Sequence, residues 1–109
     1  MTTFRALLRL LALGLALTPL GAAAQDGDVE AGKVKALTCM GCHGIEGYNN
    51  VYPAYRVPRL GGQHEDYIVA SLAAYKNGQR DHETMQAQAA SLSDQDMKDI
   101  AAYFASLSE

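Results

Sequence analysis

Residues 39–43 read Cys39-Met40-Gly41-Cys42-His43, so that two thiols are followed directly by an imidazole. Two cysteines three positions apart lie on one turn of chain, and each can form a thioether to a vinyl group of one haem. His43 would then lie beneath the iron, where its imidazole can serve as an axial ligand. The pentapeptide therefore predicts one covalent haem c, held by Cys39 and Cys42, in a protein that transfers electrons.

The same cysteines could instead form a redox dithiol or half of a zinc site. A thioredoxin-like dithiol requires a βαβ context, and no β-rich segment surrounds Cys39. A structural zinc ion needs four ligands, but the chain has only two cysteines. The remaining histidines, His64 and His82, lie 18 residues apart, which is not the spacing of a zinc finger. A disulfide between such close cysteines would constrain the unfolded chain little. The haem interpretation is therefore favoured.

Residues 1–24 are typical of a secretory signal peptide. Arg5 and Arg9 make the start positive, residues 10–17 are apolar, and the small residues 22–24 precede the expected cleavage site. A membrane anchor is the alternative, but the apolar run is shorter than the roughly 20 residues of a spanning helix and Pro19 interrupts it. Haem is attached to such proteins beyond the bacterial inner membrane. We therefore expect an exported, periplasmic protein without stable membrane insertion.

Cleavage after Ala24 would leave residues 25–109, 85 residues that make one domain. Loss of Arg5 and Arg9 would leave 7 basic and 12 acidic residues, a formal charge of −5. This balance disfavours nucleic acid as a partner and suits a protein that meets positively charged patches on redox proteins. A chain this short has a modest core, so a buried haem would supply much of its apolar surface.

Apolar spacing predicts helices over residues 28–39, 64–77 and 93–107. Residues 44–63 are rich in glycine and proline and predict a long loop, which in a small domain usually wraps a ligand or has a function. Residues 79–92 are expected to be irregular or weakly helical. Together these segments predict three helices joined by a long loop and a second irregular stretch.

The expected helix ends follow from side chains that can cap them. Asp28 is expected to cap the first helix, and Ser93 with Asp96 resembles a capping box at the last one. Gly32 lies inside the first helix at a cost of about 1 kcal/mol relative to alanine. That cost is explained if Gly32 allows another helix to approach closely, the alternative being simple tolerance near a helix end.

His43 leaves one axial position of the iron to be filled. Thioether sulfur is the usual second ligand in electron carriers, and histidine is the alternative. The candidate side chains are Met40, Met85, Met97, His64 and His82. Met40 lies within the attachment turn, Met97 falls on an apolar helix face, and both histidines are expected to be exposed among charged residues. Met85, in the segment between two helices, is therefore the favoured ligand, and the others remain alternatives.

An axial histidine needs a hydrogen-bond acceptor for its other ring nitrogen. Pro58 is the candidate acceptor for His43, because proline offers a carbonyl oxygen and has no backbone N–H of its own. Histidine and methionine together would raise the reduction potential, because a soft thioether favours ferrous iron. Two strong ligands would also leave no open position on the iron. The protein is therefore not expected to be an enzyme.

The order of motifs along residues 25–109 resembles class I cytochrome c, in particular the small soluble monohaem cytochromes of bacteria. The resemblance rests on Ala31-Gly32-Lys33, the haem pentapeptide with Gly44, residues 58–63 (PRLGGQ), Tyr67, Leu72, Tyr75, Gly78 and Arg80 ahead of Met85, residues 92–94, and residues 100–104 (IAAYF). The pentapeptide is highly specific for haem attachment, whereas the other motifs persuade by their order.

The resemblance implies an all-α fold of three to four main helices around one haem, whose edge stays exposed as the electron port. It also implies His43 and Met85 as axial ligands and the Pro58 carbonyl as the partner of His43. Gly32 is expected to face Tyr103 or Phe104 where the first and last helices cross. The tyrosine-rich insert at residues 48–55 departs from the rest of the pattern.

Three functions are open to such a protein. The favoured one is a diffusible periplasmic carrier that shuttles single electrons between respiratory complexes, a dehydrogenase or an oxidase. The alternative is the haem c subunit of a larger periplasmic oxidoreductase, for which Tyr48, Tyr52 and Tyr55 could supply an exposed apolar patch. A gas-binding sensor is disfavoured, because five-coordinate four-helix cytochromes carry the attachment motif near the C-terminus and this chain has it near the N-terminus.

Overall fold

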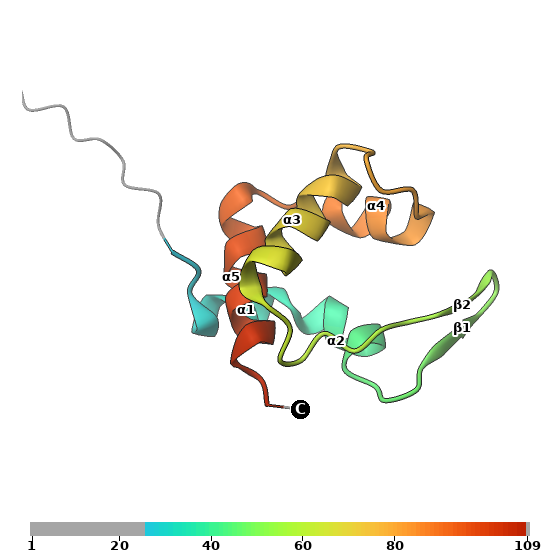
Figure 1. The fold of residues 1–109 in the computed structure, drawn as a ribbon, viewed down its shortest axis with the longest axis horizontal. Helices are drawn as coiled ribbons and strands as arrows, with labels where there is room; N and C mark the ends of the chain where they lie inside the picture. Colours follow the sequence, from blue (N-terminus) through green and yellow to red (C-terminus); the bar gives the residue numbers. More distant parts are fainter. Residues whose placement is uncertain (1–25, 109) are drawn as a thin grey trace, which may run out of the picture.

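The computed structural model describes residues 26–108, so the expected signal peptide lies outside the described residues. This part of the chain is mostly helical (Figure 1). Its elements are, in order, α1 (Val29–Lys35), α2 (Leu37–His43), β1 (Asn49–Val51), β2 (Ala54–Arg56), α3 (Glu65–Lys76), α4 (Glu83–Ala89) and α5 (Asp94–Ser106). Within residues 26–108 no helix is both long and apolar enough to cross a membrane.

The first helix begins where the sequence predicts, because the Asp28 side chain accepts a hydrogen bond from the Ala31 N–H at 2.9 Å. It does not continue to Cys39 as one helix. The chain turns at Ala36, which is fully buried, and resumes as α2. The interruption is one residue long, because the Ala36 N–H still bonds to the Gly32 carbonyl and the Ala36 carbonyl still accepts from the Met40 N–H.

α1 crosses α5 at very close range, and Gly32 makes this possible. A Cβ atom added at Gly32 would lie 1.9 Å from the Asp99 carbonyl oxygen and 2.9 Å from Tyr103 Cβ. The predicted approach of Gly32 to Tyr103 is therefore confirmed, and the conformational cost of a helical glycine is offset by helix packing.

A buried carboxylate fastens the same crossing. Asp99, only 3% exposed, accepts hydrogen bonds from the Asp28 N–H at 2.8 Å, Lys35 Nζ at 2.5 Å and Gln95 Nε2 at 2.9 Å. Lys35 Nζ also lies 2.8 Å from Asp96 Oδ1. Hydrogen bonds from Lys35 lower the pKa of Asp96 to about 2 and lower the pKa of Asp99, while the two carboxylates raise the pKa of Lys35.

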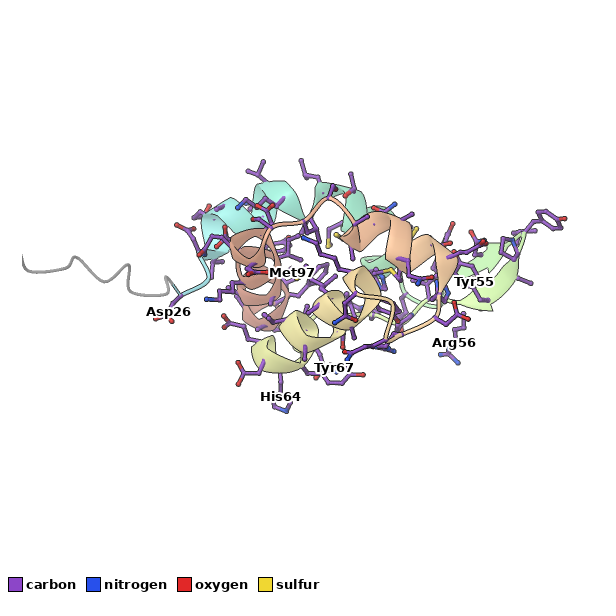
Figure 2. All side chains as sticks on the ribbon, turned by 90° about the horizontal axis from the view of Figure 1, so that it is seen from above. Asp26, Tyr55, Arg56, His64, Tyr67 and Met97 are labelled. Carbon is purple, nitrogen blue, oxygen red and sulfur yellow. The ribbon has the colours of Figure 1, made fainter. Side chains whose placement is uncertain are left out.

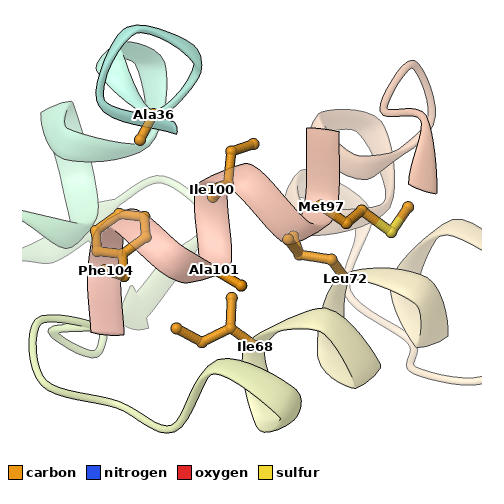
Figure 3. Close-up of a cluster of buried hydrophobic side chains, with 7 residues drawn as sticks. All are labelled: Ala36, Ile68, Leu72, Met97, Ile100, Ala101 and Phe104. Carbon is orange, nitrogen blue, oxygen red and sulfur yellow. The ribbon is translucent and has the colours of Figure 1, made fainter. Parts of the chain in front are cut away.

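The core lies where α5 packs against α3 and the turn between α1 and α2. Its buried side chains are Ala36, Ile68, Leu72, Met97, Ile100, Ala101 and Phe104 (Figure 3). The predicted capping box of α5 is confirmed, with Ser93 and Asp96 bonded reciprocally. Of the apolar positions expected along α3, Ile68 and Leu72 are buried, but Tyr67 is 54% exposed. Figure 2 shows Tyr67 and the neighbouring His64 on the outside of the molecule.

Two segments are more regular than the sequence predicts. The long loop contains an antiparallel hairpin in which Asn49, Asn50 and Val51 pair with Arg56, Tyr55 and Ala54, respectively. The hairpin projects away from the helices (Figure 1). Its three-residue strands are too short to show an alternating pattern, so the sequence could not reveal them. The segment expected to be irregular or weakly helical contains α4. The predicted helical architecture is confirmed, with five helices and one hairpin in the described residues.

Candidate haem-binding site

α2 carries all three residues of the attachment motif. Cys39 and Cys42 lie on one turn of this helix, both are half-buried, and neither is in a disulfide. Burial raises the pKa of the Cys39 thiol, so at neutral pH this sulfur keeps its proton. Two free, half-buried thiols on one helical turn are the arrangement that two thioether links to one haem require.

The His43 imidazole is oriented by the loop that follows the hairpin. Its Nδ1 lies 2.6 Å from the Pro58 carbonyl oxygen. Because a carbonyl can only accept, Nδ1 carries the proton and donates, and Nε2 is left with its lone pair for a metal. This hydrogen bond is the one predicted from the sequence. The role of His43 as an iron ligand stays a prediction.

Met85 lies in the first half of α4 and is half-buried against the core cluster. Met97 is 2% exposed within that core, as its position on the apolar face of α5 predicts. Met40 lies on the same helix as His43. Among the methionines in the described residues, Met85 is thus the half-buried one that lies on a different helix from His43.

The two other histidines differ from each other. His64 is exposed at the start of α3, as expected. His82 was expected to be exposed as well, and this is wrong. It is half-buried, packs edge-on against Tyr55, and accepts a hydrogen bond from the Met85 N–H at 3.4 Å. Its aromatic ring lies between the hairpin and α3. The charged residues beside His82 in the sequence could not indicate this position.

The residues present fit a covalently attached haem. Cys39 and Met40 from α2 and Met85 from α4 all pack against the same core cluster and remain half-exposed. No Cα atom of α2 lies within 8 Å of one in α4, so the two helices flank the core without touching through their backbones. Half-exposed apolar and sulfur-bearing side chains on two separated helices are the surface that a flat apolar ring would cover.

A hollow of about 210 Å³ lies beside His43, between the attachment helix and the C-terminal helix. Its lining residues are Met40, His43, Gly44, Arg59, Gly61, Phe104, Leu107 and Ser108. By contrast, residues 26–108 contain no group of three or more His, Cys, Asp or Glu side chains that could hold a metal ion.

Sequence reasoning missed the contacts of Tyr55, His82 and Thr84 at the start of α4. The Tyr55 hydroxyl donates to Thr84 Oγ1 at 3.0 Å, and His82 is the N-cap residue of the helix. The available signal was the position of His82 three residues before Met85, the spacing from which a cap side chain reaches a backbone N–H. The hairpin's contribution had no such signal, because Tyr55 is 27 residues earlier in the chain than His82.

Comparison with known proteins gives a consistent result. The family model for Cytochrome c matches residues 29–108. Cytochrome c4 from Pseudomonas aeruginosa is 46% identical over 96 residues, which cover 88% of this chain and 45% of that protein. Cytochrome c-554(548) from Halomonas halodenitrificans is 43% identical over 83 residues, covering 73% of this chain and 96% of that protein.

A solved structure, that of cytochrome c4 from Acidithiobacillus ferrooxidans, matches with a TM-score of 0.58 and 31% identity over 77% of this chain and 53% of that one. The chain spans about half the length of the cytochromes c4 that it matches. The family model alone covers most of residues 26–108, and it includes the attachment helix and α4. The chain therefore belongs to the cytochrome c family.

Proposed function

We propose that this chain is a periplasmic electron carrier with one haem c bound through Cys39 and Cys42 and ligated by His43 and Met85. The observation that carries the proposal is the 2.6 Å hydrogen bond from His43 Nδ1 to the Pro58 carbonyl, which leaves Nε2 available within an intact attachment motif. One such motif in the sequence supports one haem per chain.

The haem supplies reversible one-electron exchange at its iron. The residues of this chain set the conditions for that exchange. Pro58 fixes the His43 ring and makes Nε2 more basic, the Met85 thioether would favour the ferrous state, and the apolar core against which Cys39 and Met85 pack would limit access of water. If His43 and Met85 both bound the iron, no open position would be left for a substrate, and this would favour an electron carrier over an enzyme.

The proposed partners are redox proteins that approach one exposed edge of the site. The expected signal peptide at residues 1–24 supports a periplasmic location. A free carrier and a subunit of a larger oxidoreductase are distinguished by gel filtration of periplasm and solubilised membranes. A free carrier elutes alone at the size of the mature chain, whereas a subunit elutes with a constant partner.

The ligands are tested on exported protein matured in a host that attaches haem. The parent should contain one haem per chain, bind no carbon monoxide in its native ferrous form, and show the weak far-red absorbance of ferric iron ligated by thioether sulfur. Met85→Ala should remove this absorbance, whereas Met97→Ala and Met40→Ala should keep it. A colourless parent contradicts the function, and persistence of the absorbance in Met85→Ala contradicts the assignment of Met85.

A further inference from the structure

The hairpin touches the start of α4 through the side chain of one tyrosine. The ring centroids of Tyr55 and His82 are 4.7 Å apart, and the ring planes meet at 80°, an edge-to-face arrangement. The Tyr55 hydroxyl donates to Thr84 Oγ1 at 3.0 Å. Figure 2 shows Tyr55 on the hairpin strand next to one end of α4. Tyr55 therefore contacts the cap residue of α4 and a residue of its first turn.

His82 connects Tyr55 with Met85. Its Nδ1 accepts a hydrogen bond from the Met85 N–H at 3.4 Å, which makes it the cap of α4. Its ring also lies edge-on to Tyr75 of α3, with centroids 6.4 Å apart. The His82 ring is thus enclosed by aromatic rings from two elements. Because Nδ1 of this ring bonds to the Met85 N–H, the ring also restrains the backbone of Met85.

α4 has few other supports. Within residues 26–108 its Cα atoms come within 8 Å of those of α3, but not of those in α2, α5 or either hairpin strand. A helix of seven residues is also too short to be stable alone. The first turn, where Met85 lies, is therefore held by packing against α3 and the core and by the contacts among Tyr55, His82 and Thr84.

We propose that Tyr55 and His82 form a positioning pair for Met85, through which the hairpin holds the thioether in place opposite His43. This inference rests on the proposed function, because it assumes that Met85 is the second axial ligand. The tyrosine-rich insert then has a role, because it restrains the proposed iron ligand on α4 although none of its own residues is a proposed ligand.

The pair is tested on haem-loaded protein by adding imidazole, a small ligand that competes with a weakly held thioether for ferric iron. We expect His82→Ala to bind imidazole about ten times more tightly than the parent, since tenfold in a binding constant (about 1.4 kcal/mol) matches the loss of one helix cap. Tyr55→Phe, which keeps the ring and loses the bond to Thr84, should bind it about three times more tightly. Both variants should also shift the reduction potential downwards.

Conservative and matched variants separate positioning from general loosening. His82→Asn restores an acceptor for the Met85 N–H and should return imidazole affinity most of the way to the parent value. Tyr52→Ala removes a tyrosine of the same hairpin that is 94% exposed, and it should leave affinity and potential unchanged. Haem content and far-ultraviolet circular dichroism identify any variant that fails to fold, in which case Tyr55→Phe and His82→Asn carry the test.

The possible outcomes distinguish failure of the positioning pair from failure of the ligand assignment. If His82→Ala and Tyr55→Phe bind imidazole as weakly as the parent while Met85→Ala loses the far-red absorbance, the positioning pair is wrong and the ligand assignment stands. Equal effects of Tyr52→Ala and Tyr55→Phe also overturn the pair. If Met85→Ala itself keeps the absorbance, the ligand assignment fails and the pair fails with it.

Discussion

The crossing of α1 with α5 and the contact between the hairpin and α4 are held in different ways. The crossing combines backbone contact at Gly32 with a buried carboxylate that accepts three hydrogen bonds. The hairpin reaches α4 through one tyrosine, with an exposed hydroxyl bond and a ring contact. The contact that positions Met85, the proposed second ligand, is thus weaker than the crossing of α1 with α5. The first region is held by backbone packing and a buried charge, whereas the second is held by side-chain contacts alone.

The largest expected effect is at the crossing. Gly32→Ala places a methyl group 1.9 Å from a backbone oxygen of α5, and backbone cannot rotate away as a side chain can. We expect the free energy of unfolding to fall by about 3 kcal/mol, measured by denaturant titration of the haem-loaded protein.

Lys33→Ala provides the control on the same helix. Lys33 is the next residue of α1 and its side chain is exposed, so the substitution brings no new atom towards α5. This variant should change the free energy of unfolding by less than about 0.5 kcal/mol. Equal losses at both positions would show that the close approach of α1 to α5 does not govern stability.

The second effect is the loss of the buried carboxylate. Asp99→Ala leaves the Asp28 N–H without its acceptor and removes one of the two partners of Lys35. We expect a loss of about 2 kcal/mol in the free energy of unfolding, because these hydrogen bonds involve a charged group and one of them is left unmade. Asp66→Ala, on an exposed part of α3, should change it by less than about 0.5 kcal/mol.

The third effect concerns pH. The folded pKa values of Asp96, about 2, and Asp99 lie below the ordinary 3.8, so their contribution is complete above pH 3.8 and is lost as pH falls towards 2. The folded pKa of Lys35 is raised above 10.5, so its contribution is present below pH 10.5 and is lost at higher pH. Lys35→Met should therefore flatten the fall in stability between pH 4 and 2. Parallel acid curves for parent and variant, measured by urea unfolding, would contradict this.

The smallest effect on stability is at the hairpin. Tyr55→Phe loses one exposed hydrogen bond, so the free energy of unfolding should change by less than about 1 kcal/mol, by the same denaturant titration. The same variant is expected to change imidazole affinity measurably. A residue with little influence on global stability but a clear influence on the iron ligand would sharpen the distinction between the two regions. A loss of unfolding free energy as large as that of Gly32→Ala would show that the two regions do not differ in this way.

Much of the fold could be predicted from local patterns. The caps Asp28 and Ser93 and the apolar face of α5 were found because a helix terminus and a helical stripe are set by residues within a few positions of each other. The turn at Ala36 and the hairpin were not found. The first is a one-residue interruption across which the helical hydrogen bonds continue, and the second consists of strands too short to show a period.

The candidate site shows the same division. The attachment motif is local, and both the partner of His43 and the core position of Met97 followed from residue chemistry and helical spacing. The burial of His82 could not be predicted. Its charged neighbours in the sequence indicate exposure, whereas Tyr55 and Tyr75, far away along the chain, enclose its ring.

The sequence by itself determined the residues on which the proposed chemistry depends, which are two thiols and an imidazole on one turn, and it also marked the ends of the main helices. Tertiary structure alone decided how closely α1 meets α5 and which side chains hold the start of α4. The reason is physical. Thioether spacing and helix caps act over a few residues, whereas ring packing and a shared carboxylate need groups up to 71 positions apart to meet, which only the folded chain brings about.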